Sequence, residues 1–476
     1  MALQFRTGKS SATFAQTLLA QTAAQQGIDL GEPAEWRANY QRVFAQLTAI
    51  EALDEQAATQ RHLLKKLHAE IVDESARSLQ ELVAAGFATE KLDARIETAT
   101  VAGMGEASAL ATIGTLTAEN LVAQRLAEAG LLADLTEFDR LVAEGGIQAE
   151  LANTVFVTIG ANAELSLTEE LLSLGASVIA VARPNPEKWQ RLFEFAEASA
   201  GHLTYPRFAG KPGLALDSQI ELTANWLGDV LRQHSQKRVV CLGFVYAPGS
   251  AQIIASAAQD ALMAAIADQV GASKFVAGWL ATPLDSYCVE QSLLESQQQE
   301  FDARKLGTRL RDALLGLSAA RAESALRGSE SALELAQQLG ASGRAVADFS
   351  ANRQGSSYLL AKRIERWRAS ELASRGFTVW FQVTPAARTH STLDYKFVRA
   401  AYRGLARLGI VTFEAWMLRD LLTACLLGRL SRKALDSASA HPEDSAIHGK
   451  LWRMPYRLER LWVASFIAGL DEYLRR

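Results

Sequence analysis

Tyr358 and Lys362 stand four residues apart in the run from Gly355 to Lys362. In a helix, residues at this spacing share one face, so the ammonium group would favour the phenolate and lower the tyrosine pKa toward working pH. A tyrosine placed in this way can pass a proton to or from a carbonyl oxygen. The pair therefore predicts an acid–base site, although an isolated Tyr and Lys on a solvated helix also show this spacing.

The segment after the pair has the order expected of a helix followed by a strand. Gly376 is suited to end a helix, residues 377–383 are rich in β-forming residues, and a proline-marked turn follows at 384–389. This order of Tyr-x-x-x-Lys, helix, glycine, strand and proline turn resembles the catalytic half of the short-chain dehydrogenase/reductases. The resemblance implies that Tyr358 is the general acid/base and that Lys362 also holds the nicotinamide ribose.

The matching nucleotide half is expected in residues 154–183, which predict a buried strand, a small-residue turn, a helix and a second apolar strand. Such a unit places a diphosphate at the N-terminus of its helix. The turn residues assigned to the diphosphate are Gly160, Ala161, Asn162 and Leu165. The turn has one obvious glycine where the usual fingerprint has three, and Glu164 would put a negative charge beside the diphosphate. The alternative is a unit that kept its fold and lost its nucleotide.

Arg183 bears on the choice of nucleotide, because an arginine at the end of the second strand suits a 2′-phosphate. It favours NADP over NAD, although a solvated residue before a proline turn would look the same. By the resemblance, Asp217 would meet the adenine ring, but it could equally be a helix N-cap. Thr384, Pro385 and Thr389 would close over the nicotinamide side.

The fourth and fifth strands are predicted at 238–243 and 274–281. After the fourth strand, the chain from Gly243 to Gly249 lacks the Asn-Asn-Ala-Gly of ordinary family members. It resembles more closely the ketoreductase domains of large fatty-acid synthases, which would imply an acyl thioester on a carrier. After the fifth strand, Thr282 or Ser286 could orient a substrate carbonyl. Both are also ordinary turn residues, and the sequence does not distinguish between them.

Three further segments flank or interrupt this unit. Residues 1–150 are expected to form an all-helical domain that packs on the nucleotide-binding unit or mediates dimerisation, with a linker at 101–106. Residues 289–352 have apolar residues at helical spacing and predict a helical insertion, which could be a lid, a surface decoration or an oligomer contact. Residues 431–476 are expected to form a helical tail.

The bulk properties agree with a soluble enzyme. A chain of 476 residues is long enough for two or three domains, and its 49% hydrophobic content supports substantial cores. A net charge of -4 gives no electrostatic reason to expect nucleic acid as a partner. The three cysteines are far apart, no Cys/His cluster has metal-ligand spacing, and the start of the chain lacks a signal peptide core. We therefore expect a cytoplasmic protein without a metal site or a membrane span.

Together, these features predict an α/β protein with a doubly wound Rossmann-type parallel sheet in residues 151–430. The resemblance implies an NADPH-dependent carbonyl reductase that acts on a small-molecule or thioester-carried carbonyl substrate, expected as a homo-oligomer. The competing hypothesis is a catalytically inactive, Rossmann-derived protein that senses a nucleotide or serves as a scaffold. The reduced glycine content of the first turn favours this second hypothesis, whereas the presence of Tyr358 and Lys362 argues against it.

Overall fold

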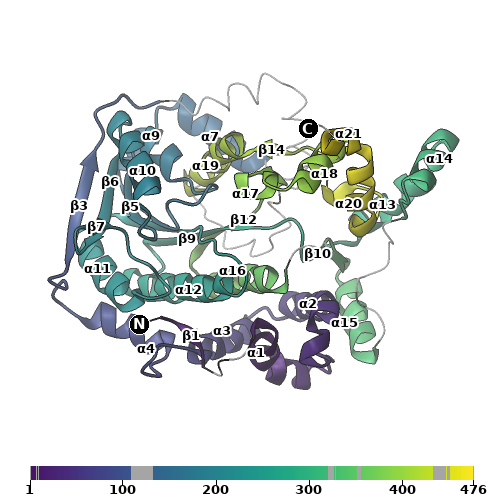
Figure 1. Cartoon of the computed structure of the whole chain (residues 1–476), viewed down its shortest axis with the longest axis horizontal. Helices are drawn as coiled ribbons and strands as arrows, with labels where there is room; N and C mark the ends of the chain where they lie inside the picture. Colours follow the sequence, from purple (N-terminus) through teal and green to yellow (C-terminus); the bar gives the residue numbers. More distant parts are fainter. Residues whose placement is uncertain are drawn as a thin grey trace.

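The structure, a computed structural model, describes residues 2–6, 8, 10–108, 132–319, 326, 329–350, 355–431, 446 and 451–474. Its centre is an eight-stranded, mostly parallel sheet with helices on both faces (Figure 1). The strands are β3 (Ile96–Ala102), β4 (Thr154–Ile159), β5 (Ser177–Val181), β6 (His202–Phe208), β7 (Lys211–Pro212), β8 (Arg238–Gly243), β9 (Phe275–Ala281) and β12 (Thr378–Val383). The predicted α/β class with a mostly parallel central sheet is confirmed.

The parallel part of the sheet has the order β6-β5-β4-β8-β9-β12. The first of these strands in the chain, β4, therefore lies in the middle, between the second and the fourth. Strands β4, β8 and β9 are buried almost throughout, as expected for continuous apolar runs that are covered on both faces. Because these strands are parallel, their carboxyl ends lie at one edge of the sheet.

Strand β3 extends the sheet at the side of β6, with which it pairs antiparallel from Ile96 opposite Phe208 to Ala102 opposite His202. The prediction of an all-helical segment 1–150 is therefore wrong, and the expected linker at 101–106 begins inside this strand. The reason is that β3 is an edge strand with mostly exposed or half-exposed residues. Its sequence, Ile-Glu-Thr-Ala-Thr-Val-Ala, consequently lacks the apolar run of a buried strand.

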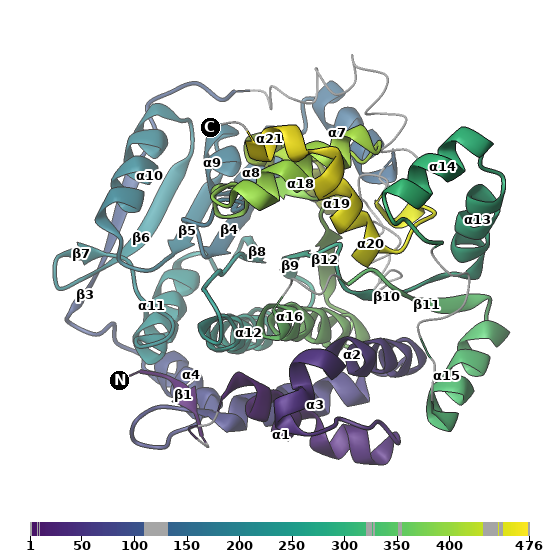
Figure 2. The same cartoon turned by 45° about the vertical axis from the view of Figure 1, so that its right-hand side comes forward.

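Two layers of helices cover the faces of the sheet (Figure 2). One face carries α11 (Ile220–Gln233), α12 (Ala251–Val270) and α16 (Ser356–Ser374), and the other carries α9 (Thr168–Ser173), α10 (Pro186–Ala198) and α19 (Ala415–Ser431). The strands supply both cores by alternation: on β8, Cys241 belongs to the first core, whereas Val240 and Leu242 belong to the second. As predicted, α16 ends before a left-handed glycine, Gly376, with φ of 80°.

The N-terminal helices form a third layer beneath α11, α12 and α16 (Figure 2). They are α1 (Ser11–Gln25), α2 (Trp36–Leu53), α3 (Ala58–Glu70) and α4 (Leu79–Ala88). Helix α4 begins with a capping box in which Ser78 and Glu81 satisfy each other's backbone N–H groups. Apolar residues of these helices, such as Phe44 and Leu67, share one continuous core with Ile364 of α16 and Val157 of β4. The N-terminal helices thus continue the core of the sheet.

The inserted segment is opened and closed by an antiparallel pair of strands, β10 (Ser286–Glu290) and β11 (Arg344–Asp348). Between them lie the helices α13 (Gln291–Asp302), α14 (Leu306–Leu314) and α15 (Glu330–Ala341). The strand pair was not predicted. Leu306, Leu310 and Leu314 are three of the apolar residues at helical spacing in this segment, and they are exposed on α14, which projects from the body of the molecule (Figure 1).

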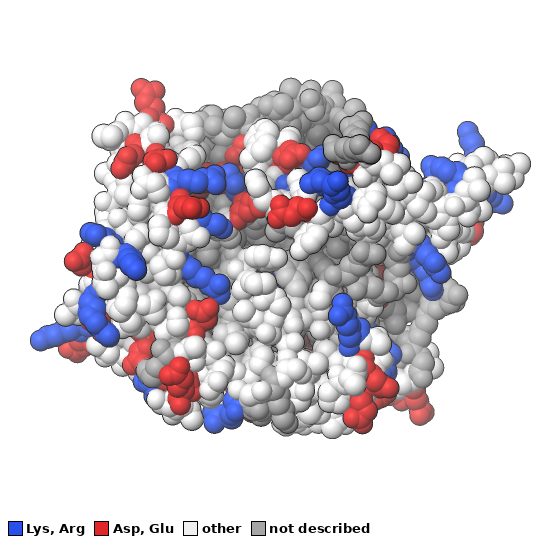
Figure 3. All heavy atoms as spheres, viewed as in Figure 1, with Lys and Arg blue, Asp and Glu red and all other residues white. Residues whose placement is uncertain are grey.

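The tail contributes η3 (Leu451–Arg453), α20 (Leu458–Ala468) and α21 (Leu470–Leu474). The remaining elements are β1 (Gln4–Phe5), η1 (Pro33–Glu35), β2 (Ile71–Val72), α7 (Leu132–Ala143), α8 (Ile147–Ala152), β13 (Ala387–Arg388), α17 (His390–Leu393), α18 (Lys396–Arg407) and β14 (Phe413–Glu414). Among the described helices, none has both the length and the apolar character to cross a membrane. On the face drawn in Figure 3, basic and acidic side chains are interspersed, in keeping with the net charge of -4.

Candidate active site at the carboxyl edge of the sheet

The parallel strands bring the predicted site positions to one edge of the sheet. Gly160 directly follows β4, Thr282 follows β9 and Thr384 follows β12, while Arg183 stands two residues beyond β5 and Gly243 is the last residue of β8. In open parallel sheets, ligands bind outside this edge, near the point where the strand order reverses. Here that point lies between β4 and β8, because the chain continues from β4 to β5 on one side and from β8 to β9 on the other.

Tyr358 lies in the first turn of α16, half-buried, and buried Thr282 is near enough to lower the pKa of its phenol, as the smallest of five influences on that group. The ammonium nitrogen of Lys362, one helical turn further on, is 5.9 Å from the centre of the Tyr358 ring. The structure thus brings together three side chains that were singled out in the sequence. The hydroxyl groups of Tyr358 and Thr282 and the ammonium group of Lys362 therefore lie near one another at the end of β9.

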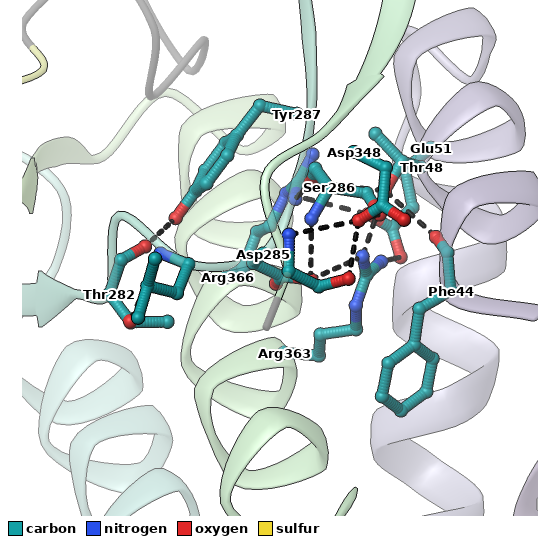
Figure 4. Close-up of polar contacts among 12 residues, drawn as sticks. Phe44, Thr48, Glu51, Thr282, Asp285, Ser286, Tyr287, Asp348, Arg363 and Arg366 are labelled. Atoms are coloured by element: carbon teal, nitrogen blue, oxygen red, sulfur yellow. Dashed lines mark hydrogen bonds and ion pairs between the residues drawn. The ribbon is translucent and has the colours of Figure 1, made fainter. Parts of the chain in front are cut away.

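Ser286, the alternative hydroxyl, has a different environment. It is the first residue of β10, where it pairs with Asp348, and its Oγ donates a hydrogen bond of 3.5 Å to the carboxylate of Asp348 (Figure 4). Of the two hydroxyl groups that the sequence left open, Thr282 contacts Tyr358, whereas Ser286 belongs to a buried ionic cluster. Ser286 differs from Thr282 because the register of the β10–β11 pair places it opposite Asp348.

A buried carboxylate holds Lys362 in place. The Lys362 ammonium donates hydrogen bonds to the carbonyl oxygen of Leu280 at 3.0 Å and to the carboxylate of Glu365 at 2.9 Å. Burial is the largest single influence and opposes the charge on Lys362, but Glu365 and Tyr358 together outweigh it, so the pKa of Lys362 is raised. Lys362 is therefore a charged group with a fixed position.

The pKa of Tyr358 is raised above its ordinary value, so the expected lowering is wrong. Burial of the phenol is the largest cause, and the opposing charge of Lys362 does not overcome it. Glu365 and the phenol of Tyr246, which lies in the turn after β8, raise the pKa further. At neutral pH, Tyr358 is consequently a protonated phenol, which is the form of a proton donor.

The turn after β8 is fastened to α12 by two glutamines that the sequence analysis missed. Gln259 accepts a hydrogen bond from the backbone N–H of Val245 at 3.1 Å, and its amide donates one to Glu365 at 3.5 Å. Gln252 donates to the carbonyl oxygen of Val245 at 3.2 Å. A Cβ at Gly243 would lie 2.5 Å from the Gln259 amide, so this glycine makes room for that side chain. Their sequence signal is the spacing of polar residues on one face of an alanine-rich helix.

The turn after β4 contains the predicted diphosphate residues. Gly160 has a φ of 92°, and a Cβ there would lie 2.6 Å from the backbone of Phe244. The backbone N–H groups of Gly160 and Ala161 both donate to the carbonyl oxygen of Val181, at 2.8 and 3.1 Å. In the arrangement described, these two donors are therefore already used within the protein.

Two other residues of this turn differ in how they are placed. The side-chain amide nitrogen of Asn162 is buried and has no hydrogen-bond partner among the described residues. The backbone carbonyl oxygen of Asn162 accepts a hydrogen bond of 3.3 Å from the ammonium group of Lys188. Leu165 packs against the hydrophobic core of this face. An unsatisfied buried amide and a nearby cation are features that an anionic group could use.

Glu164 places a negative charge in this turn and so opposes an anion. Its carboxylate accepts hydrogen bonds from the backbone N–H of His390, at 2.9 and 3.0 Å, and is 2.9 Å from the His390 ring. This contact raises the pKa of His390. It joins the turn after β4 to the start of α17, so the two loops that would enclose a nucleotide touch each other through Glu164.

Arg183 and Asp217, both predicted to meet the nucleotide, form an ion pair of 3.1 Å with each other on the surface. At the end of β12, the backbone N–H and the hydroxyl of Thr384 both donate to the carbonyl oxygen of Ala281, at 3.0 and 3.1 Å. Pro385 is buried and Thr389 is half-buried in the loop beyond. These contacts place the loop at the expected edge and use the Thr384 hydroxyl to join β12 to β9.

Among the described residues, no group of three or more His, Cys, Asp or Glu side chains is arranged to hold a metal ion. The chain matches no model of a known protein family, and no curated protein is similar to it in sequence. The chemistry of the site therefore follows from its own geometry.

Proposed function

We propose that this chain is an NADPH-dependent carbonyl reductase of the short-chain dehydrogenase/reductase type. The observation that carries the proposal is the placement of Tyr358 in the first turn of α16 and of Thr282 directly after β9, with the charged Lys362 5.9 Å from the centre of the Tyr358 ring. The strand order supports it, because it is the order of the doubly wound Rossmann fold, with β4 as the first strand. A pure scaffold would have no use for a charged lysine fixed beside a half-buried tyrosine.

In this proposal, a substrate carbonyl oxygen binds between the hydroxyl groups of Thr282 and Tyr358. The carbonyl carbon receives a hydride, and the phenol of Tyr358 transfers its proton to the oxygen, so that the product is an alcohol. Lys362 stabilises the phenolate that is left, and Glu365 keeps the ammonium group in position. The raised pKa of Tyr358 suits this direction, because reduction requires a proton donor.

The described residues fit NADP in part. Asn162 and Lys188 would contact the diphosphate, Gly160 lets the turn pass close to Phe244, and Arg183 would meet the 2′-phosphate in place of Asp217. NADPH supplies the hydride when it is bound. Glu164 would have to leave its position between the two loops, because its charge would repel the diphosphate.

The second candidate function is a Rossmann-derived protein that senses a nucleotide or serves as a scaffold, without turnover. Two specific observations favour it: the N–H groups of Gly160 and Ala161 are already bonded to Val181, and the carboxylate of Glu164 occupies the space between the loops. Tyr358, Thr282 and Lys362 argue for the reductase. The homo-oligomeric state and the cytoplasmic location remain predictions, and the first can be checked by measuring the mass of the protein in solution.

The test is carbonyl-dependent oxidation of NADPH by the wild-type chain, Tyr358→Phe and Tyr205→Phe. The substrates should include aldehydes, ketones and 3-ketoacyl thioesters, because the class of carbonyl is open. Tyr205 is a matched control, since it also has a raised pKa through burial but lies on β6, away from Thr282. The proposal expects activity in the wild type and the control, and a loss of roughly 10²- to 10⁴-fold in Tyr358→Phe. Full activity in a folded Tyr358→Phe variant would remove the catalytic assignment.

A further inference from the structure

The turn from Thr282 to Ser286 joins β9 to the inserted strand pair and carries the hydroxyl group that contacts Tyr358. Its backbone carbonyl groups are bound by donors from distant parts of the chain. The indole N–H of Trp452 donates to the carbonyl oxygen of Pro283 at 2.9 Å, and the backbone N–H of Phe349 donates to that of Asp285 at 3.1 Å. The carbonyl oxygen of Ser286 accepts bonds from the hydroxyl of Thr48 at 3.3 Å and from the guanidinium of Arg366 at 2.9 Å. Within the turn region, the phenol of Tyr287 donates to the carbonyl oxygen of Thr282.

These donors include all three additions to the sheet. Thr48 lies on α2 of the N-terminal helices, Phe349 follows β11 at the end of the insertion, and Trp452 lies in η3 of the tail. Trp452 also stacks on Phe349, with ring centres 4.8 Å apart, and lies against Tyr287. The additions therefore converge on one short turn.

A buried ionic cluster holds the side chain of the same turn (Figure 4). The guanidinium of Arg363 is fully buried and donates to Asp285 at 2.9 Å and to Thr48 at 2.9 Å. Glu51 of α2 lies 3.5 Å from Arg363 and 3.4 Å from Arg366. The N-terminal helix α2 thus supplies both a hydroxyl group and a carboxylate to the arginines that follow Lys362 on α16.

A buried ionic cluster contributes little net stability to a core, because burying its charges costs free energy. Removing charges from water requires several compensating contacts, and apolar side chains of the same size often stabilise a protein as well or better. Although Glu51 Oε2 and Arg363 Nε have no hydrogen-bond partner among the described residues, the other bonds of the cluster join three segments, and buried polar groups bonded in this way specify one arrangement of the backbone. The arrangement specified here is that of the Thr282 turn relative to α16, which carries Tyr358.

We propose that the three additions are positioning elements of the active site, and that Thr48 and Trp452 set the place of Thr282 against Tyr358 through the backbone of the turn. Neither Thr48 nor Trp452 is a catalytic residue in this account: Trp452 acts through the carbonyl group of Pro283, and Thr48 acts through the carbonyl group of Ser286 and through Arg363, which holds Asp285. The expected change in kcat rests on the proposed reductase function. The expected loosening of the Thr282 turn does not depend on that function. Small displacements of a reacting group are costly to turnover, so a looser turn would lower kcat.

The first experiment uses Thr48→Val, which removes the hydroxyl but keeps the shape, and Thr48→Ser, which restores the hydroxyl. Thr223→Val on α11 is the matched control: both threonines are completely buried, and both donate to the carbonyl oxygen four residues earlier at 2.9 Å. Only Thr48 also contacts the turn, directly at Ser286 and, through Arg363, at Asp285. Two quantities are measured in the full chain: amide hydrogen exchange of peptides that cover residues 282–290, and the kinetic constants with NADPH and a carbonyl substrate.

We expect Thr48→Val to speed exchange in residues 282–290 severalfold and to lower kcat about tenfold, with the dissociation constant for NADPH unchanged. Thr48→Ser should restore both, and Thr223→Val should change neither. Unchanged exchange in Thr48→Val would overturn the inference, and so would unchanged kcat in an active enzyme. If the wild type reduces no carbonyl but exchange responds as expected, the reductase proposal fails while the positioning of the turn stands.

Trp452→Phe tests the tail independently, should Thr48→Val not fold. It removes the indole N–H that binds Pro283 and keeps an aromatic ring beside Phe349. Trp226→Phe is its control, because that buried indole donates to Thr98 at 3.0 Å, outside the turn. Faster exchange in residues 282–290 for Trp452→Phe alone supports the inference, and equal behaviour of the two variants contradicts it.

Discussion

The two halves of the sheet edge differ in how their polar groups are held. On the side proposed to bind the carbonyl substrate (the carbonyl side), beyond β9, the side chains of Lys362 and Glu365 are 12% and 1% exposed and bonded to each other. On the side proposed to bind the nucleotide (the nucleotide side), beyond β5, the paired side chains of Arg183 and Asp217 are 47% and 38% exposed. The carbonyl side is therefore preorganised, whereas the nucleotide side would have to exchange surface contacts for ligand contacts.

The difference between the two sides should have its largest effect on the free energy of unfolding of variants that lose one ionic partner. Glu51→Ala would leave Arg363 and Arg366 with less compensation for their buried charge, and we expect it to lower the free energy of unfolding by about 3–5 kcal/mol. Asp217→Ala, which removes the partner of the exposed Arg183, should cost less than about 1 kcal/mol. Urea denaturation of both variants measures the difference. Equal losses would show that the carbonyl side is no more tightly built than the nucleotide side.

The choice of nucleotide should depend on Arg183. Arg183→Asp replaces the cation at the end of β5 by an anion, and we expect the preference for NADPH over NADH to fall at least about tenfold. Arg207→Asp is the control, because Arg207 is similarly exposed and is also paired on the surface, with Glu97 at 3.5 Å. Dissociation constants for both nucleotides, measured by nicotinamide fluorescence, decide the point. An unchanged preference would remove the reason for choosing NADP.

Glu164 should weaken nucleotide binding. Glu164→Gln removes the negative charge that accepts hydrogen bonds from His390, and we expect NADPH to bind severalfold more tightly, equivalent to about 1 kcal/mol. Glu194→Gln on α10 makes the same change of charge away from the turn. If Glu164→Gln binds NADPH no better than the wild type and the control, the carboxylate does not face the diphosphate.

The raised pKa of Tyr358 predicts a small pH effect on reduction. Because the phenol keeps its proton up to its pKa, which lies above the ordinary value of 10.0, kcat should be nearly flat from pH 7 to 9 and should fall only at higher pH. The oxidation of an alcohol, which needs the phenolate, should instead become faster as the pH rises. A fall in the reductive kcat with a midpoint below pH 9 would contradict the raised pKa.

The elements that were predicted correctly from the sequence are those whose secondary structure is determined by the local pattern of apolar residues and turns. Strands β4, β8 and β9 are short apolar runs between turns, and Tyr358 and Lys362 share a helix face through their spacing alone. Strand β3 was missed because an exposed edge strand has no apolar run. The β10–β11 pair was missed because its partners are separated by the whole insertion.

The details of the site depended on contacts that spacing cannot show. The choice between Thr282 and Ser286 follows from the pairing of Ser286 with Asp348, 62 residues away. The direction of the Tyr358 pKa shift follows from burial, and the position of Lys362 from Glu365 and the nearby Gln259. Each of these is a tertiary effect, so the sequence could single out the candidate residues but not their protonation state or their bonding partners.

The most direct test of the account is a titration of the wild-type chain with NADPH and with NADH, followed by nicotinamide fluorescence and by the shift in Tm. A ligand that binds the folded state must raise its stability. The account predicts saturable binding with tighter affinity for NADPH, accompanied by an increase in Tm. No response to either nucleotide at millimolar concentration would contradict it and would favour the scaffold.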